Sequence, residues 1–186
     1  MSENNDQAVA PRTLDGWSVL HQIFSVDWPR WNAAPEAEKA EVAAGAAGYL
    51  EKAAGVADGE SAAFSLLGHK GDPLFLNFRK TLDELNEVEL GFRRLPLYGY
   101  LRETTSYLSF LELGLYEMTV KFHGELVEAG LKPGGDEWKE RWAAEMASQR
   151  ERMIGRLFME IPEDRYLCFY PMNKRRGEEK NWYGLS

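Results

Sequence analysis

The stretch that decides the fold is Gly16-Trp17-Ser18-Val19-Leu20-His21-Gln22-Ile23-Phe24. Its side chains alternate well enough to predict a β-strand, because successive residues of a strand point to opposite faces. One predicted face carries Trp17, Val19, His21 and Ile23, and the other carries Ser18, Leu20, Gln22 and Phe24. Apolar side chains on both faces predict a sheet that is covered on both sides. Asp27-Trp28-Pro29 then breaks the strand.

The pattern that follows this strand predicts a ferredoxin-like unit. The predicted elements are a helix over 35–52, strands over 62–67 and 74–78 that form a hairpin, a helix over 82–94 and a strand over 104–115. Thr81 with Glu84 three residues later predicts a capping box at the start of the second helix. The order strand, helix, strand, strand, helix, strand indicates two helices on one face of a four-stranded antiparallel sheet. The predicted fold class is therefore α+β.

The rest of the chain divides into three further parts. Residues 1–13 are polar and predict a mobile tail, before a ferredoxin-like domain over 14–116. Residues 117–158 predict two linker helices, broken at 132–135, with Asp136 as the cap of the second helix. Residues 159–186 contain one predicted strand, 166–171, which cannot bury a core alone. We therefore expect them to start a second domain that is incomplete in this chain.

Composition excludes several classes of function. The chain has 186 residues and a formal net charge of −8, which argues against general nucleic-acid binding and a polybasic membrane anchor. Its one cysteine, Cys168, excludes an intramolecular disulfide framework and is expected to be buried in its strand. No apolar run reaches the roughly 18–20 residues of a membrane helix, and Met1 to Arg12 lack the apolar core of a signal peptide. These features predict a soluble, cytoplasmic protein.

The strongest chemical signal lies near the C-terminus. The stretch is Phe169-Tyr170-Pro171-Met172-Asn173-Lys174-Arg175-Arg176, followed by Asn181-Trp182-Tyr183. A phenol at a strand end beside a cationic cluster suits a flat, anionic ligand, because lysine and arginine pair with carboxylates. By itself, a basic triplet of this kind is more often a solvated loop.

Histidine chemistry is less informative. His21 is predicted to lie on a sheet face, His69 in a turn and His123 on a helix surface. None has a partner at metal-ligand spacing, so no protein-ligated metal site is predicted. The chain also lacks a phosphate-binding loop and a serine nucleophile elbow.

This C-terminal stretch resembles the signature of the chlorite dismutase-like haem proteins. Within them it is most similar to the coprohaem decarboxylases of the coproporphyrin-dependent haem pathway. Further similarity lies in Thr13-Leu14-Asp15-Gly16-Trp17, Thr81-Leu82-Asp83-Glu84-Leu85, Ser106-Tyr107 and Glu112-Leu113. The resemblance covers residues 13–186. It implies a dimeric α+β barrel of two ferredoxin-like repeats, five subunits in a ring, and haem in the C-terminal repeat.

The implied reaction is the peroxide-dependent oxidative decarboxylation of two coprohaem propionates to vinyl groups, giving haem b. The resemblance assigns Tyr170 as the catalytic, radical-forming tyrosine. It assigns haem-binding roles to Arg156 and Lys174, which hold propionates, to Met172 and the backbone around Pro171 and Asn173, and to Trp182 near the porphyrin. Tyr116 falls near another contact of the family. A tyrosine at position 170 favours the decarboxylase over the chlorite-degrading enzymes.

Two features depart from the family pattern. The region 117–150 is longer than in short bacterial members. The axial histidine of the family lies beyond the Asn-Trp-Tyr motif, so we expect the chain to lack the iron ligand and to need its missing half for activity. His123 precedes a glycine, as that ligand often does, but lies in the wrong half. The alternatives are a non-catalytic ferredoxin-like assembly or regulatory subunit without haem and, more weakly, a chlorite dismutase.

Overall fold

A central strand, β1, organises the computed structural model, which describes residues 13–68 and 70–170. All strand pairs are antiparallel, and the sheet order is β2-β3-β1-β4. The four strands are β1 (Thr13–Val26), β2 (Gly59–Ser65), β3 (Pro73–Arg79) and β4 (Leu101–Gly114). This topology confirms the predicted α+β class and the ferredoxin-like arrangement.

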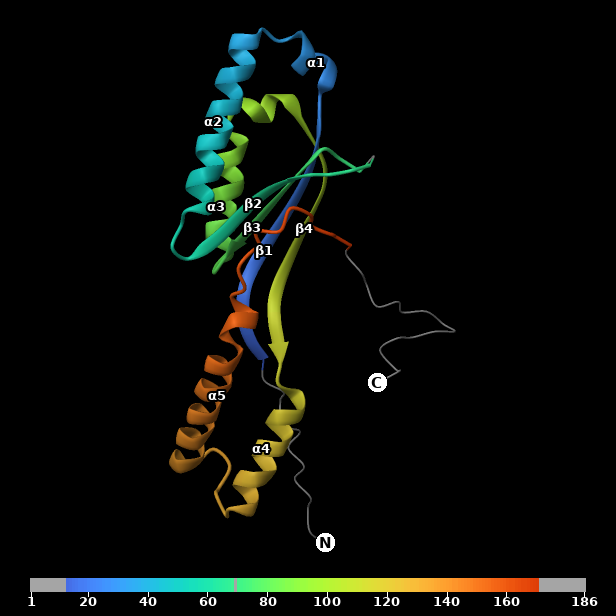
Figure 1. Ribbon diagram of the computed structural model, residues 1–186. Helices are drawn as coiled ribbons and strands as arrows, with labels where there is room; N and C mark the ends of the chain where they lie inside the picture. The colour runs from blue at the N-terminus through green and yellow to red at the C-terminus, as the bar shows by residue number, and fades with distance from the viewer. Residues whose placement is uncertain (1–12, 69, 171–186) are drawn as a thin grey trace, which may run out of the picture.

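The helices cover one face of the sheet and extend one end of the molecule. In Figure 1, α2 and α3 lie side by side against the sheet, whereas α4 and α5 form a hairpin that extends away from it. The helices are α1 (Trp28–Ala33), α2 (Glu36–Ala54), α3 (Leu82–Arg93), the 3-10 helix η1 (Pro96–Tyr100), α4 (Tyr116–Glu128) and α5 (Asp136–Leu157). Among the described residues, no helix combines the length and the apolar character needed to cross a membrane.

Local signals explain where the helices begin. The Thr81 hydroxyl accepts a hydrogen bond from the Glu84 backbone N–H at 3.2 Å, and the Glu84 carboxylate accepts one from the Thr81 N–H at 3.0 Å. The predicted capping box is therefore confirmed. Leu82, the first residue of this helix, is 50% exposed.

Two other helix starts differ from the prediction. The sequence around Asp27 was predicted only to break the first strand. The Asp27 carboxylate instead accepts a hydrogen bond from the Arg30 N–H and caps the short helix α1. Gly135, rather than Asp136, is the N-cap of α5, and Asp136 lies in the first turn, where its negative charge still favours the helix dipole.

Both faces of β1 are buried, as its sequence predicted. On the helix-covered face, Phe24 packs with Phe75 and Phe92. On the other face, Trp17 and Val19 form a cluster with β3. The partly buried residues Phe158 and Ile161, from the chain after α5, pack against that second cluster.

The α4–α5 hairpin is fixed at its base and at its tip. At the base, Leu157 is fully buried and packs with Leu14 and Leu115. At the tip, the His123 ring lies 5.0 Å from the Trp138 ring. The prediction that His123 is a helix-surface residue is therefore wrong, because this histidine is half-buried under a tryptophan.

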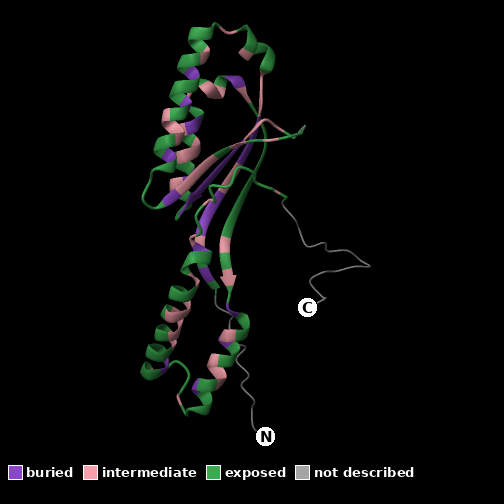
Figure 2. Ribbon diagram, viewed as in Figure 1, coloured by how far each residue is buried: buried purple, intermediate pink, exposed green. Residues whose placement is uncertain are grey.

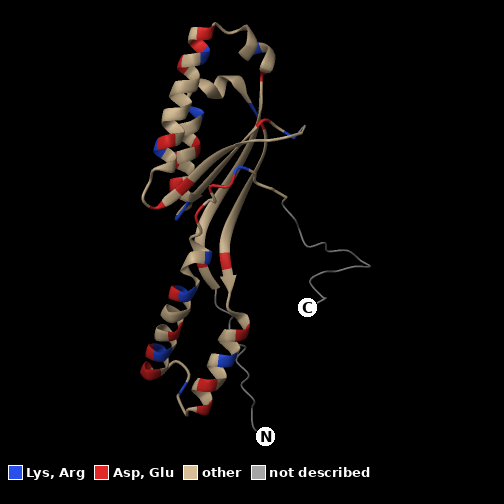
Figure 3. Cartoon of the chain, viewed as in Figure 1, with Lys and Arg blue, Asp and Glu red and all other residues tan. Residues whose placement is uncertain are grey.

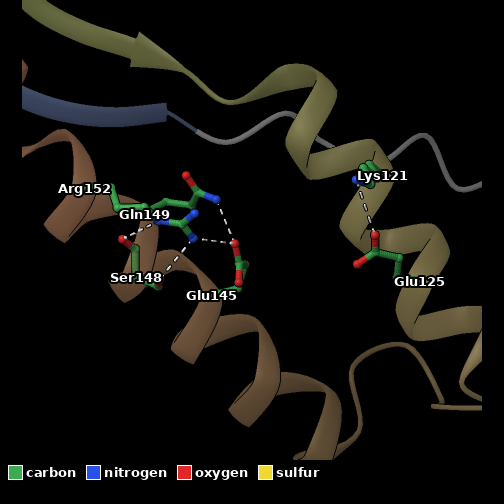
Figure 4. Close-up of polar contacts among 6 residues, drawn as sticks. All are labelled: Lys121, Glu125, Glu145, Ser148, Gln149 and Arg152. Atoms are coloured by element: carbon green, nitrogen blue, oxygen red, sulfur yellow. Dashed lines mark hydrogen bonds and ion pairs between the residues drawn. The ribbon is translucent and has the colours of Figure 1, made fainter.

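Between base and tip, polar side chains satisfy one another along each helix. Figure 4 shows Lys121 reaching Glu125 on α4, at 3.8 Å, and Arg152 reaching Glu145 on α5, at 3.4 Å. Gln149 also donates to the Glu145 carboxylate at 2.7 Å. These exposed pairs contribute little free energy each, so the hairpin depends mainly on its apolar contacts.

β4 is an edge strand with little cover. Residues 102–110 are exposed on both faces, and Figure 2 shows β4 largely green beside the buried β1. The exposed side chains include Tyr107, Leu108 and Phe110. Charged residues are more frequent on the helices than on the strands, as Figure 3 shows.

The predicted strand over 166–171 is wrong within the described residues, which end at Tyr170. Residues 166–170 form no strand and pair with none of the described strands, and in Figure 1 the segment crosses the face of the sheet instead of running along an edge. Cys168 was predicted to be buried in that strand and is exposed.

Candidate functional site

The candidate site is formed where the chain after α5 crosses the open face of the sheet. Phe158 packs edge-on against the Trp17 ring at 5.0 Å. The Trp17 indole N–H donates to the Met159 carbonyl at 3.0 Å. The Ile161 N–H donates to the Glu60 carboxylate at 3.4 Å. These contacts fix the beginning of the crossing segment on β1 and β2.

A second set of contacts fixes its far end. The Phe169 ring stacks on the His21 ring, with centroids 5.2 Å apart and planes inclined by 25°. It meets the Tyr107 ring edge-on at 6.1 Å. His21 and Tyr107 are cross-strand partners on β1 and β4. We call these three side chains, His21, Tyr107 and Phe169, the aromatic clasp.

Tyr170 follows the clasp directly. Its side chain is 65% exposed, and no hydrogen bond joins its phenol to another described residue. Phe169 is half-buried on the sheet, whereas both of its neighbours, Cys168 and Tyr170, are exposed.

Arg156 lies in the last turn of α5 and is exposed. Its closest polar contact is with the Met153 sulfur at 4.0 Å, and it has no carboxylate partner in the part of the chain that the structure describes. No hydrogen bond or ring contact joins it to Tyr170 there. Tyr116, at the start of α4, is 57% exposed and packs against Gly114. Within the described ranges, the predicted site thus supplies a cation without a carboxylate partner and a phenol without a hydrogen bond.

Five predicted ligand-binding residues lie outside the described residues: Pro171, Met172, Asn173, Lys174 and Trp182. His69 also lies outside them. Their predicted roles stay predictions.

A cleft opens beside the clasp. Its volume is about 520 Å³, and its lining is mainly apolar, with Lys70 as the charged side chain among the described residues. The lining residues are Ile23, Leu66, Leu67, Gly68, Lys70, Thr104, Thr105, Tyr107 and Phe169. An apolar recess next to the residue before Tyr170 is the kind of surface that a flat apolar ligand can contact.

Burial affects the protonation of His21 in the clasp. It lowers the pKa of His21 below its ordinary value, and the Tyr107 carbonyl 3.3 Å from Nδ1 opposes this shift. The imidazole is therefore neutral around pH 7, which suits stacking against an uncharged phenyl ring. In the described parts of the chain, no three His, Cys, Asp or Glu side chains are grouped so as to hold a metal ion.

Sequence reasoning placed His21 on a sheet face, which the structure confirms. It missed that His21 and Tyr107 receive Phe169. The sequence did predict both β1 and β4 as strands. The alternation of side chains does not give the register between two strands. It also does not give the path of a segment that pairs with neither of them.

Comparisons with known proteins agree on a family. A family model described as chlorite dismutase matches residues 39–186. The chain is 36% identical over 180 residues to a protein of Staphylococcus carnosus named coproheme decarboxylase, covering 95% of this chain and 64% of that protein. It is 37% identical over 182 residues to a Halobacterium salinarum relative, covering 96% of this chain but 33% of that protein. The chain thus spans between one third and two thirds of these relatives.

A solved structure is similar to this chain in three dimensions as well as in sequence. It is described as a novel heme-binding protein from Thermus thermophilus. Its TM-score is 0.63 at 32% sequence identity, over 94% of this chain and 62% of that one. The ferredoxin-like unit and most of the remaining chain therefore have a counterpart in an experimental structure.

Proposed function

This chain belongs to the chlorite dismutase family, and from that premise we propose that the protein binds haem and decarboxylates coprohaem with hydrogen peroxide. The identity to a coproheme decarboxylase supports the reaction class. The observation that carries the proposal is the exposed Tyr170 phenol, presented beside an anchored aromatic residue. We also infer, from the same resemblance, that residues 159–186 begin a haem-binding repeat and that the protein is a cytoplasmic homo-oligomer.

Two described side chains, Arg156 and Tyr170, support a porphyrin that carries carboxylates as the ligand. Arg156 has no carboxylate partner within the described ranges, so its guanidinium is available for a propionate. Lys174 would supply a second cation. Met172, Trp182 and the backbone around Pro171 and Asn173 would line the ring, and together these residues would orient one propionate toward Tyr170.

Tyr170 would move the electron and the proton. Iron porphyrin and peroxide together supply the oxidising equivalents. The phenol loses one electron and its proton, and the phenoxyl group takes a hydrogen atom from a propionate methylene. Loss of a second electron and of the C–C bond to the carboxylate releases CO₂ and leaves a vinyl group. Each propionate consumes one H₂O₂ and one proton and yields two waters.

The test uses the full protein and ferric coprohaem. Titration should give a saturable, shifted Soret band, and added peroxide should convert coprohaem to haem b. The Tyr170→Phe variant removes the phenol O–H while keeping the ring, so binding should stay within about twofold while turnover falls by about 10² or more. Tyr166→Phe, at a 79% exposed tyrosine of the same segment, is the matched control and should retain turnover. Full turnover by Tyr170→Phe would remove this phenol from the mechanism, and absence of binding would end the proposal.

A further inference from the structure

The segment that carries Tyr170 is fixed to the sheet at two separate places. Its first attachment is the set of contacts from Phe158 to Ile161. Its second is the aromatic clasp at Phe169. Residues 162–168 between them are exposed, and none of them is part of a strand or helix. The position of Tyr170 therefore depends on the second attachment, which lies one residue away.

His21 and Tyr107 form a binding site for the aromatic ring of Phe169. His21 and Tyr107 face each other across the β1–β4 ladder, so both rings come from the same face of the sheet. The contact between His21 Nδ1 and the Tyr107 carbonyl, at 3.3 Å, fixes the imidazole plane on which Phe169 stacks. Phe169 is half-buried while Cys168 and Tyr170 are exposed. His21 and Tyr107 thus hold Phe169, and this contact determines where the next residue, Tyr170, lies.

We propose that His21 and Tyr107 are positioning residues, which hold Phe169 and thereby fix the place from which Tyr170 presents its phenol to the substrate. This inference rests on the proposed function of Tyr170. It adds two residues of the N-terminal sheet to the machinery of a site whose other predicted members follow α5 or lie in its last turn. The rings of His21 and Tyr107 act through Phe169 and need not touch the substrate.

The first experiment measures the clasp without any haem. Cys168 is the only cysteine of the chain, is exposed and adjoins Phe169, so a nitroxide attached to it reports the motion of this segment. We expect a restricted spectrum for the parent protein and a mobile one for His21→Ala and for Phe169→Ala. His21→Phe keeps a ring for stacking and should restore the restricted spectrum. Leu108→Ala, on the opposite face of β4 and 53% exposed, is the control and should change nothing.

Amide hydrogen exchange provides the same test without a label. Residues 166–170 should exchange faster in His21→Ala than in the parent and at the parent rate in His21→Phe. Equal label mobility and equal exchange in the parent and Phe169→Ala would overturn the clasp, whatever the enzymatic result.

The second experiment measures positioning in the full protein with ferric coprohaem and peroxide. His21→Ala should bind coprohaem within about twofold of the parent, because His21 is not among the residues that line the cleft beside the clasp. Its turnover number and its yield of tyrosyl radical should fall about 10- to 100-fold, the scale of a misplaced reactive group. His21→Phe should recover both.

The two experiments separate the two hypotheses. An unchanged radical yield in His21→Ala, with a mobile Cys168 label, would overturn the positioning role and leave the proposed function standing. Absence of coprohaem binding by the parent protein would overturn the proposed function, and with it the role of the clasp in catalysis. Loss of binding in His21→Ala alone would show that the sheet contacts the ligand directly, which also contradicts the proposal.

Discussion

At the scale of single residues, Arg79 is a buried cation whose loss should destabilise the sheet. It is 4% exposed, and its guanidinium donates to the carbonyls of Ala53, Glu60 and Phe78 and to the Ser61 hydroxyl. The Ala53 bond also places a cation at the C-terminal end of α2, where the helix dipole favours it. Arg79 thereby ties α2, β2 and β3 together.

Arg79→Met should therefore destabilise the fold strongly. It keeps much of the aliphatic volume but leaves buried acceptors unpaired, and we expect a loss of about 2–5 kcal/mol in the free energy of unfolding. Urea denaturation monitored by circular dichroism measures it. Lys80→Met, which removes an exposed bridge to Asp58, should cost less than about 1 kcal/mol. Equal losses in the two variants would show that the buried guanidinium contributes no more than a surface charge.

His21 should make stability depend on pH. Burial lowers its pKa below the ordinary 6.5, so the unfolded chain binds a proton more readily than the folded chain. The stabilisation is complete above pH 6.5 and is lost as the pH falls from there through the lower pKa of the folded protein. Urea midpoints at several pH values measure this loss, which should be smaller in His21→Phe. Identical pH dependence in both proteins would assign the loss to other groups.

Sequence predicted individual residues best where the chemistry is local. Thr81 and Glu84 satisfy each other within one helical turn, so their capping box was readable from spacing alone. His123 and Cys168 were mispredicted because their burial depends on distant partners. Trp138 from α5 covers the first, and no paired strand covers the second.

At the scale of elements, Gly16 governs how α5 docks on β1. A Cβ at this position would lie 2.2 Å from the Leu157 carbonyl oxygen, which is backbone and cannot rotate away. Gly16→Ala should therefore push the end of α5 off the strand and cost about 1–3 kcal/mol of unfolding free energy. Thermal or urea unfolding would show it.

Gly48→Ala is the matched control. Gly48 lies inside α2, and a Cβ there meets nothing within 4 Å. This change should stabilise the protein by about 0.5–1 kcal/mol, because alanine loses less backbone entropy in a helix. A neutral Gly16→Ala would mean that α5 approaches β1 less closely than described.

Most helices and strands were predicted from the sequence, and their order along the chain predicted the ferredoxin-like arrangement. Strand alternation, helical spacing and caps located β1 to β4 and α2 to α5 with boundary shifts of a few residues. The short helix α1 was missed because six residues give too little periodicity. The strand predicted at 166–171 failed over 166–170 because aromatic and apolar content favours a strand, whereas pairing depends on a free sheet edge being within reach.

At the scale of the whole molecule, the chain has separate apolar clusters rather than one core. One lies between the sheet and α2 and α3, around Phe24 and Phe92, and another joins the α4–α5 hairpin to the end of the sheet through Leu157. The hairpin extends beyond the sheet and depends on this junction (Figure 1). Local unfolding of the hairpin is therefore expected before global unfolding.

Leu157→Ala should make local unfolding of the α4–α5 hairpin more frequent. Leu157 is fully buried, and its truncation should cost about 2–5 kcal/mol. Amides of α4 and α5 should exchange much faster, while those of β1 and β3 keep their protection. Ile154→Ala, one turn earlier and 55% exposed, is the control and should leave both patterns unchanged. Uniform loss of protection in sheet and hairpin would show one cooperative unit instead.

The central place of β1 also has a consequence during synthesis of the chain. Of the four strands described, β1 leaves the ribosome first, and its two neighbours are encoded much later, since Ile23 pairs with Leu74 and Thr13 with Gly114. At about 5–20 residues per second, this strand waits several seconds to tens of seconds for its second partner. Throughout that interval its apolar side chains, Trp17 and Phe24 among them, are without their final neighbours. A nascent chain of this kind is a natural client for chaperones that shield hydrophobic segments at the tunnel exit.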